Sequence, residues 1–287
     1  MRHPNRHALL AVTAVIATLG CLKSPTESDD EFLPITALDG TTRLASEILT
    51  PVGDGPYPAI VIVPGTEMNV RQAFVSESQY HVLLGFASAR YDNRGVGQST
   101  GEFVETTPEN SEEVFDVLAD DVIAVVNYLK TRPEIDANNI GLLGGSEAGW
   151  IIALAASRSA DVKFTVSVSG AASTVGLTEY YASISTELSE EEIAEALANF
   201  SGTHGFDPAP LLESHDVPGL WVYGGQDKVN PTVNDMAILQ QIDTDFDQDF
   251  TICLFPRANH SLQNVVDGEP LAIRPECVTP WLQDRRD

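Results

Sequence analysis

The sequence predicts an α/β protein with a doubly wound, mostly parallel sheet, N-terminal antiparallel strands and a small helical cap. Short apolar runs of the kind buried inside a sheet, such as Ala59–Val63, recur along the chain. Segments with apolar residues at helical spacing lie between them, most clearly in residues 111–130. Because strands that alternate with helices are joined by crossovers, the strands of such a sheet run parallel.

The elements follow one another from residue 32. Residues 35–38 and 44–49, with a turn at Asp39-Gly40, predict a hairpin that adds antiparallel edge strands. Further strands are predicted at residues 59–63, 86–91, 140–143, 164–168, 220–223 and 250–255, and helices at residues 75–84, 111–130 and 148–158.

Residues 173–213 do not fit this alternation, because they are too long for one crossover. They contain a capping box at 189–192, followed by apolar residues on one helical face. We interpret the segment as a small cap over the carboxyl ends of the strands, where such sheets bind ligands. The alternative is a surface excursion with no role in substrate binding.

Composition limits the classes of function. The chain has 287 residues, 43% of them hydrophobic, and residues 32–287 suit one α/β domain. The formal net charge of −26 argues against binding to nucleic acid and against adsorption to anionic lipid. It favours a neutral or cationic small-molecule substrate, although a charge of this size also serves solubility alone.

The N-terminus predicts export. Residues 1–21 have a basic start and an apolar core at 8–20, which is typical of a secretory signal. The end of this segment, Thr18-Leu-Gly-Cys21, resembles the lipobox of bacterial lipoproteins. Acylated Cys21 would then be the only membrane attachment, with residues 22–31 as a tether, and the protein would be a periplasmic or cell-envelope lipoprotein. Ordinary cleavage nearby would instead give a secreted protein.

The remaining cysteines form an even pair. In an oxidising compartment, Cys253 and Cys277 are expected to form a disulfide. Two separate buried thiols are the alternative.

The sharpest local pattern is Gly144-Gly-Ser-Glu-Ala-Gly149, which follows a predicted strand and opens a predicted helix. This is the context of a nucleophile elbow, in which the helix N-terminus favours negative charge developing beside Ser146. Ala148 stands where the usual pattern has its second glycine. Taken alone, the segment also fits a glycine-rich turn with an ordinary serine.

A nucleophilic serine needs a base, and the base needs an orienting carboxylate. Asp227 follows the predicted strand at 220–223, and His260 follows the predicted strand at 250–255. Both therefore belong to loops at the carboxyl edge of the sheet, in the chain order serine, acid, base. We predict a catalytic triad of Ser146, Asp227 and His260.

The oxyanion hole is expected to use backbone N–H groups of Glu147, Thr66 and Glu67, since Pro64 has none. This chemistry requires no cofactor, and no pattern in the sequence resembles a zinc site. The acidic run at residues 243–249 is interpreted as a solvated loop in preference to a calcium site.

With these residues placed, the chain resembles the α/β-hydrolase superfamily, and within it bacterial esterases related to prolyl-oligopeptidase-like and dienelactone-hydrolase-like enzymes. The resemblance covers about residues 33–262, and the segments that carry it are 90–101, 140–149, 206–218, the acid loop at Asp227 and the base loop at 258–260. Pro64 departs from the family, which usually has histidine there.

The resemblance and the triad together predict a serine hydrolase that cleaves a carboxylic ester through an acyl-enzyme on Ser146. Thioesters and amides use the same residues, so a thioesterase, a peptidase or an amidase stays open. A binding protein on a hydrolase scaffold is the alternative from another class. The expected partner is a small-molecule acyl substrate, and the residues that bind it and the oligomeric state are left open.

Overall fold

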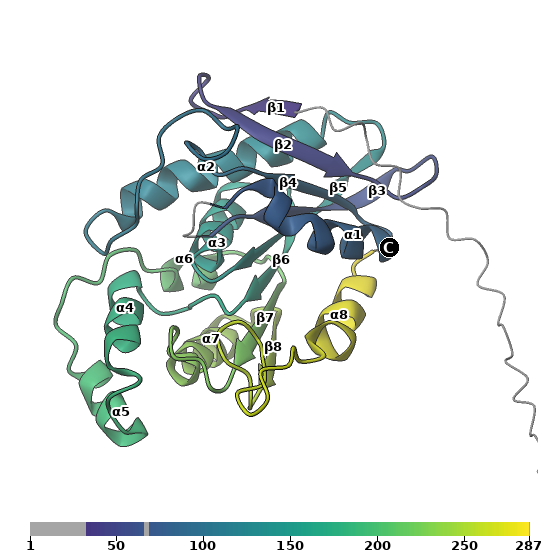
Figure 1. Ribbon diagram of the computed structural model, residues 1–287. Helices are drawn as coiled ribbons and strands as arrows, with labels where there is room; N and C mark the ends of the chain where they lie inside the picture. Colours follow the sequence, from purple (N-terminus) through teal and green to yellow (C-terminus); the bar gives the residue numbers. More distant parts are fainter. Residues whose placement is uncertain (1–32, 66–68, 287) are drawn as a thin grey trace, which may run out of the picture.

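The strands of the protein form one eight-stranded sheet in a computed structural model that describes residues 33–65 and 69–286 (Figure 1). Their order across the sheet is β1-β2-β4-β3-β5-β6-β7-β8. The strands are β1 (Leu33–Thr36), β2 (Arg43–Leu49), β3 (Tyr57–Val63), β4 (Ala87–Tyr91), β5 (Ile135–Gly145), β6 (Val162–Val168), β7 (Gly219–Gly224) and β8 (Phe250–Phe255).

The pairing confirms the predicted fold class. β1 pairs with β2 and β2 with β4 in antiparallel register, and every other neighbouring pair is parallel. The hairpin prediction is therefore correct. Because the parallel strands share one direction, the loops that follow β5, β7 and β8 all leave the sheet at its carboxyl edge.

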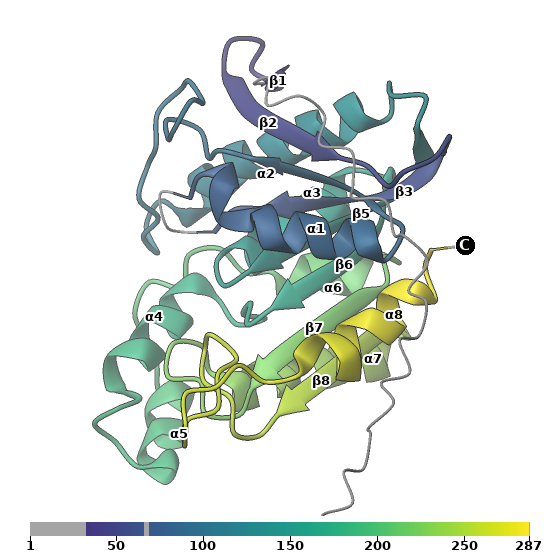
Figure 2. The ribbon, with the colours of Figure 1, turned by 45° about the vertical axis from the view of Figure 1, so that its right-hand side comes forward.

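Helices cover both faces of the sheet (Figure 2). On one face lie α2, α3, α6 and α7, and on the other lie α1 and α8, while α4 and α5 project away from both layers. The bounds are α1 (Val75–Leu83), α2 (Ser111–Leu129), α3 (Ala148–Arg158), α4 (Val175–Ile184), α5 (Glu190–Ala198), α6 (Ala209–Ser214), α7 (Thr232–Phe246) and α8 (Thr279–Gln283).

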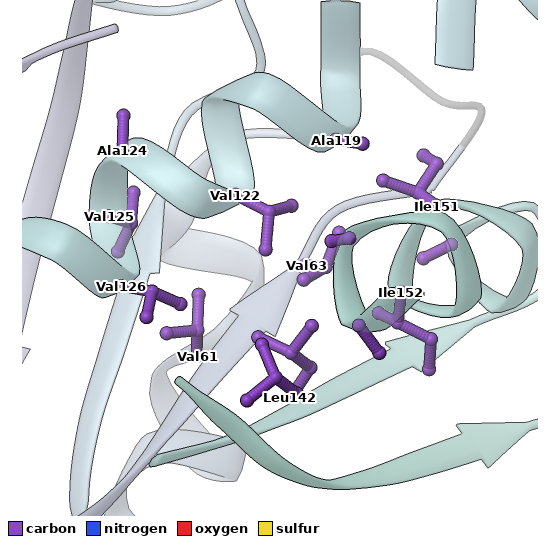
Figure 3. Close-up of a cluster of buried hydrophobic side chains, with 14 of the residues drawn as sticks. Val61, Val63, Ala119, Val122, Ala124, Val125, Val126, Leu142, Ile151 and Ile152 are labelled. Carbon is purple, nitrogen blue, oxygen red and sulfur yellow. The ribbon is translucent and has the colours of Figure 1, made fainter. Parts of the chain in front are cut away.

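The main core lies between the sheet and the helices α2 and α3 (Figure 3). Val61 and Leu142 point from β3 and β5 toward Val122 of α2 and Ile152 of α3, and all four side chains are almost fully buried. Removing such side chains from water is the main stabilising contribution to the fold, at about 25 cal/mol per Å² of apolar surface. This packing fixes α3 against the strand that carries the elbow.

The C-terminal segment packs on the opposite face of the sheet. Trp281 of α8 contacts the Phe164 ring of β6 edge-on, and Leu282 is fully buried there. A disulfide joins Cys253 of β8 to Cys277 in the single π-helical turn Arg274–Val278 that leads into α8. The two cysteines are thus joined to each other in the structure, as the sequence predicts.

The sequence predicts the elements of the sheet better than the segments outside it. The observed α3 and β8 have the predicted bounds, whereas α7 is not predicted at all. The acidic run at 243–249 is not the loop expected from its composition, because Asp243 and Asp245 lie in the last turns of α7 and Asp247 is its left-handed C-cap. Within residues 173–213, α4 and α5 project from the body, but α6 packs between α3 and α7 as part of the main layer.

Several predicted features lie outside the described residues. These are the signal at 1–21 with Cys21, the tether at 22–31, and the oxyanion candidates Thr66 and Glu67. Within residues 33–65 and 69–286, no helix combines the length and the apolar character needed to cross a membrane.

Candidate active site

Ser146 lies in the turn between β5 and α3, at the carboxyl end of a central strand. Its φ is 53°, a left-handed backbone conformation that a residue with a side chain adopts only where the surrounding structure imposes it. Its N–H donates to the Val168 carbonyl at 3.0 Å, which ties the turn to the end of β6. The hydroxyl is thus held above the edge of the sheet by a strained and anchored backbone.

The elbow accepts alanine at position 148 because position 144 is glycine. A Cβ built on Gly144 would lie 2.7 Å from the Ala148 Cβ, closer than two carbons approach. Ala148 itself is fully buried. The space between β5 and α3 therefore holds one methyl group, which this sequence supplies from the helix side.

His260 lies between the serine and the acid. Its Nε2 is 3.1 Å from the Ser146 Oγ, and its Nδ1 is 2.8 Å from the Asp227 Oδ2. The Asp227 Oδ1 accepts hydrogen bonds from the N–H groups of Val229 and Asn230 at 2.7 and 2.9 Å. The buried carboxylate is thereby fixed, and it holds the imidazole with Nδ1–H toward itself and Nε2 free to accept the serine proton.

The acid loop and the base loop pack directly on each other. The Gln226 N–H donates to the Ala258 carbonyl at 2.8 Å, two residues before His260. A Cβ on Gly224 would lie 2.5 Å from the Asn259 carbonyl oxygen, so only glycine lets the base loop approach this closely. Gly224 is therefore a positioning residue that the sequence motif contains without revealing its role.

Of the residues predicted to form the oxyanion hole, Glu147 lies within the part of the chain that the structure describes. The Glu147 N–H opens α3 directly after the nucleophile, and Gly65 faces it from the loop after β3. A Cβ on Gly65 would lie 3.6 Å from the Ala148 nitrogen and 3.9 Å from the Glu147 nitrogen, so glycine keeps the space before these donors open. The Asn93 side chain donates to the Gly65 carbonyl at 3.1 Å and holds the loop there.

Sequence reasoning missed a buried carboxyl group close to the triad. Asp235 of α7 is fully buried, and its Oδ1 accepts hydrogen bonds from the backbone N–H groups of Ala172 and Ser173 at 3.1 and 2.9 Å. Burial raises the pKa of Asp235 to about 7, and nearby Asp227 adds to this shift, while the hydrogen bonds to Ser173 and Ala172 oppose it. No sequence motif marks this residue.

The predicted cap, of which α4 and α5 project from the body, reaches the acid loop through α4. The Tyr181 hydroxyl donates to the Asp227 main-chain carbonyl at 2.7 Å, and the Ser185 hydroxyl donates to the Lys228 carbonyl at 2.7 Å. Burial and the nearby Asp227 raise the pKa of Tyr181 to about 12, so the hydroxyl keeps its proton for this bond. The cap is in this way joined to the loop that carries the acid.

The site brings together the residues predicted to be the nucleophile, the base and the acid, and it has no metal-binding arrangement among the described residues. No group of three or more His, Cys, Asp or Glu side chains in that part of the chain is placed to hold a metal ion. The arrangement is suited to proton transfer from the serine hydroxyl to His260, with the helix N-terminus facing the charge that forms.

The sheet order, the strained serine turn and the helices on both faces together define an α/β-hydrolase. The model of the prolyl oligopeptidase family matches residues 72–271, well over half of the chain, and the protein belongs to this family. It is a hydrolase of the prolyl-oligopeptidase and dienelactone-hydrolase type, as the resemblance in its sequence implies.

Comparison with curated proteins gives shorter matches. Human mitochondrial palmitoyl-protein thioesterase ABHD10 is 32% identical over 124 residues, which are 42% of this chain and 36% of that protein. Across the three curated relatives compared, the matched segment covers between 36% and 58% of the relative's length.

Solved structures match over most of the chain. Acylaminoacyl peptidase from Pyrococcus horikoshii superposes with a TM-score of 0.67 at 17% identity, over 93% of this chain and 42% of that one. Acetyl xylan esterase 1 from Thermoanaerobacterium sp. JW/SL YS485 gives a TM-score of 0.65 at 17% identity, over 92% of this chain and 89% of that one. At these identities the similarity shows the shared fold.

Proposed function

We propose that the protein is a serine esterase that hydrolyses carboxylic esters of small molecules through an acyl-enzyme. The observation that carries the proposal is the position of His260, whose two ring nitrogens lie within hydrogen-bonding distance of Ser146 and Asp227. A chain of contacts in this order serves acyl transfer, because it couples proton removal from the nucleophile to a fixed carboxylate.

The reaction proceeds in two halves. The Ser146 Oγ attacks the ester carbonyl carbon while His260 Nε2 takes the hydroxyl proton, and the Glu147 N–H stabilises the oxyanion. The bond to the alcohol then breaks as His260 returns the proton to the leaving oxygen, which leaves the acyl group on Ser146. Water, deprotonated by His260, attacks this acyl group and releases the carboxylic acid and the free serine.

A thioesterase is the second candidate function. It is favoured by the local match to a palmitoyl-protein thioesterase, and the same triad would serve a thioester without change. An amide substrate, as in peptidases, depends more strongly on the same protonation by His260, because an amine is a poorer leaving group than an alcohol. Membership of the prolyl oligopeptidase family favours this reaction as well.

The test is hydrolysis of p-nitrophenyl acetate, butyrate and octanoate by the purified full-length chain, beside the Ser146→Ala variant. Loss of the hydroxyl should lower kcat by about 10⁴-fold or more. Ser214→Ala removes an exposed serine from α6 and should leave the rates unchanged. A fluorophosphonate probe should label the wild-type chain and fail on Ser146→Ala.

The outcomes separate the alternatives. Labelling of Ser146 without turnover of any ester would replace the esterase proposal with a thioesterase or amidase, to be measured on acyl-thioester and peptide substrates. If the probe does not label the chain and no ester is hydrolysed, the remaining interpretation is a binding protein on a hydrolase scaffold.

A further inference from the structure

A cavity of about 470 Å³ lies beside the elbow, between the loop that follows β4 and the first turns of α2. Glu147, which directly follows Ser146 in the sequence, lines the cavity from the elbow. Its apolar lining comes from Phe103, Val104, Val114, Val117 and Leu118. A volume of this size is typical of a pocket for part of a small molecule.

The charged groups around this cavity do not balance. Three carboxylates line it, those of Glu102, Glu113 and Glu147, and the one basic side chain among its described lining residues is Arg94. The Arg94 guanidinium is already engaged with Asp121, whose two oxygens it contacts at 2.8 and 2.6 Å. The cavity therefore carries an excess of negative charge beside its apolar lining. Glu102 and Glu113 are exposed to solvent, whereas Glu147 is buried, and charges near a buried group interact more strongly than in water.

Glu147 is the buried carboxyl group among the residues that line the cavity. The residue is only 6% exposed, and the Thr106 hydroxyl donates a hydrogen bond to it. Burial raises the pKa of Glu147 to about 7, and the Glu179 carboxylate of α4 adds to the shift. A buried carboxylate next to an open cavity gains stability when a cation enters beside it.

We propose that this cavity binds a positively charged alkylammonium group of the substrate, with Glu147 as the specificity-determining residue. The inference rests on the proposed esterase function and adds the substrate class. Apolar walls suit the alkyl carbons of such a group, and the three carboxylates suit its charge. Because the Glu147 N–H also faces the oxyanion position, the cation lies a short distance from the ester carbonyl that Ser146 attacks.

The test uses pairs of esters that differ only in charge. One pair carries the charge on the acyl side, p-nitrophenyl 4-(trimethylammonio)butyrate against p-nitrophenyl 5,5-dimethylhexanoate. The other carries it on the alcohol side, acetylcholine against 3,3-dimethylbutyl acetate. We expect kcat/KM to favour the cation by about tenfold or more in one pair, and that pair identifies the side of the ester which enters the cavity.

The variant Glu147→Gln keeps the shape and removes the charge, so it should reduce this preference to near unity. Glu276→Gln removes the same charge from an exposed position on the opposite face, and it should leave the preference intact. A preference lost equally in both variants would reflect the long-range field of the acidic protein and would overturn the assignment to this cavity.

The preference should also depend on pH. Glu147 becomes charged as the pH rises through about 7, so the cation-to-neutral ratio should increase from pH 6 to pH 8. Glu102, Glu113 and Arg94 line the same cavity, and the Glu179 carboxylate acts on Glu147 from α4. Both esters of a pair use the same triad, so their ratio reports the charge preference.

Equal rates in both pairs, or faster hydrolysis of the neutral esters, would overturn the inference and leave the esterase proposal standing. If p-nitrophenyl butyrate is hydrolysed but no member of either pair is, the cavity does not accept these groups and the inference fails. If no ester at all is hydrolysed, the proposed function fails and this inference fails with it.

Discussion

The helix that follows the nucleophile and the helices of the cap are held in opposite ways. In α3 every residue from 148 to 156 is buried, between the sheet on one side and α2 and α6 on the other. In α5 the single buried residue is Ile193, and α5 is joined to the molecule mainly through α4. Ser146 therefore lies at the start of a fully packed helix, whereas α5 is held by few contacts.

This difference separates two tasks. Attack by Ser146 requires a geometry fixed before the substrate arrives, and close packing supplies it. The cap instead makes a small number of polar contacts to the acid loop, through Tyr181 and Ser185. Changes in the cap should alter rates by small factors, whereas changes under the elbow should alter both folding and catalysis.

Among the changes that compare these two regions, the largest effect is expected from a methyl group added under the elbow. In Gly144→Ala the new methyl meets the Ala148 Cβ at 2.7 Å, and overpacking of this kind costs about 1–3 kcal/mol of stability. The displaced helix N-terminus should also lower kcat for p-nitrophenyl butyrate by at least about tenfold. Urea unfolding and steady-state kinetics measure the two effects.

The double variant Gly144→Ala/Ala148→Gly is the matched control, because it moves one methyl from the helix side to the strand side. It should recover part of both losses, with the remainder due to the helical glycine and to contact with the Ala148 main chain. Additive losses in the double variant would contradict the interpretation that one shared space holds a single methyl.

The packed region is also the one that the sequence predicts best. The elbow, α3 and β8 follow from apolar runs and glycine spacing, because burial leaves a regular pattern in the residues it requires. Ser146, Asp227 and His260 each follow a parallel strand, and parallel strands end at one edge of the sheet. The sequence therefore predicts that the three residues lie close together, and the structure places them within hydrogen-bonding distance.

The parts that were not predicted lack such a pattern. In α7 the buried residues Thr232, Asp235, Leu239 and Ile242 mix polar and apolar types, so apolar spacing alone does not mark a helix. The role of Gly224 depends on the Asn259 carbonyl, which lies far away in the sequence. The cavity beside Glu147 likewise depends on which loops meet, and no local motif encodes it.

An intermediate effect is expected at Asp235, which joins α7 to the residues where the cap begins. Its carboxyl group keeps its proton in the folded protein up to about pH 7, whereas in the unfolded chain it ionises near pH 4. Between these values the folded state binds the extra proton, so stability falls as pH rises, by up to about 1.4 kcal/mol per pH unit.

Asp235→Asn replaces the titrating carboxyl group with an amide, so the free energy of unfolding should depend less on pH between pH 5 and pH 7. The control Asp243→Asn, exposed on the same helix, should keep the wild-type slope. Unfolding free energies from urea titrations at pH 5, 6, 7 and 8 test this, and equal slopes in wild type and Asp235→Asn would show that Asp235 is ionised throughout.

The smallest effect is expected where the cap meets the acid loop. Tyr181→Phe removes the hydroxyl that donates to the Asp227 carbonyl at 2.7 Å and leaves the ring in place. One neutral hydrogen bond contributes about 0.5–1.5 kcal/mol, so kcat/KM for p-nitrophenyl butyrate should fall by about threefold to tenfold if the bond positions Asp227. The melting temperature should change by only about 2–4 °C.

Tyr180→Phe makes the same chemical change one residue earlier, where the ring stacks on Phe200 with centroids 5.1 Å apart. It should leave kcat/KM unchanged, because this ring belongs to the contacts within the cap. Equal rates for Tyr181→Phe and wild type would mean that the acid loop is held by its own backbone hydrogen bonds at Val229 and Asn230.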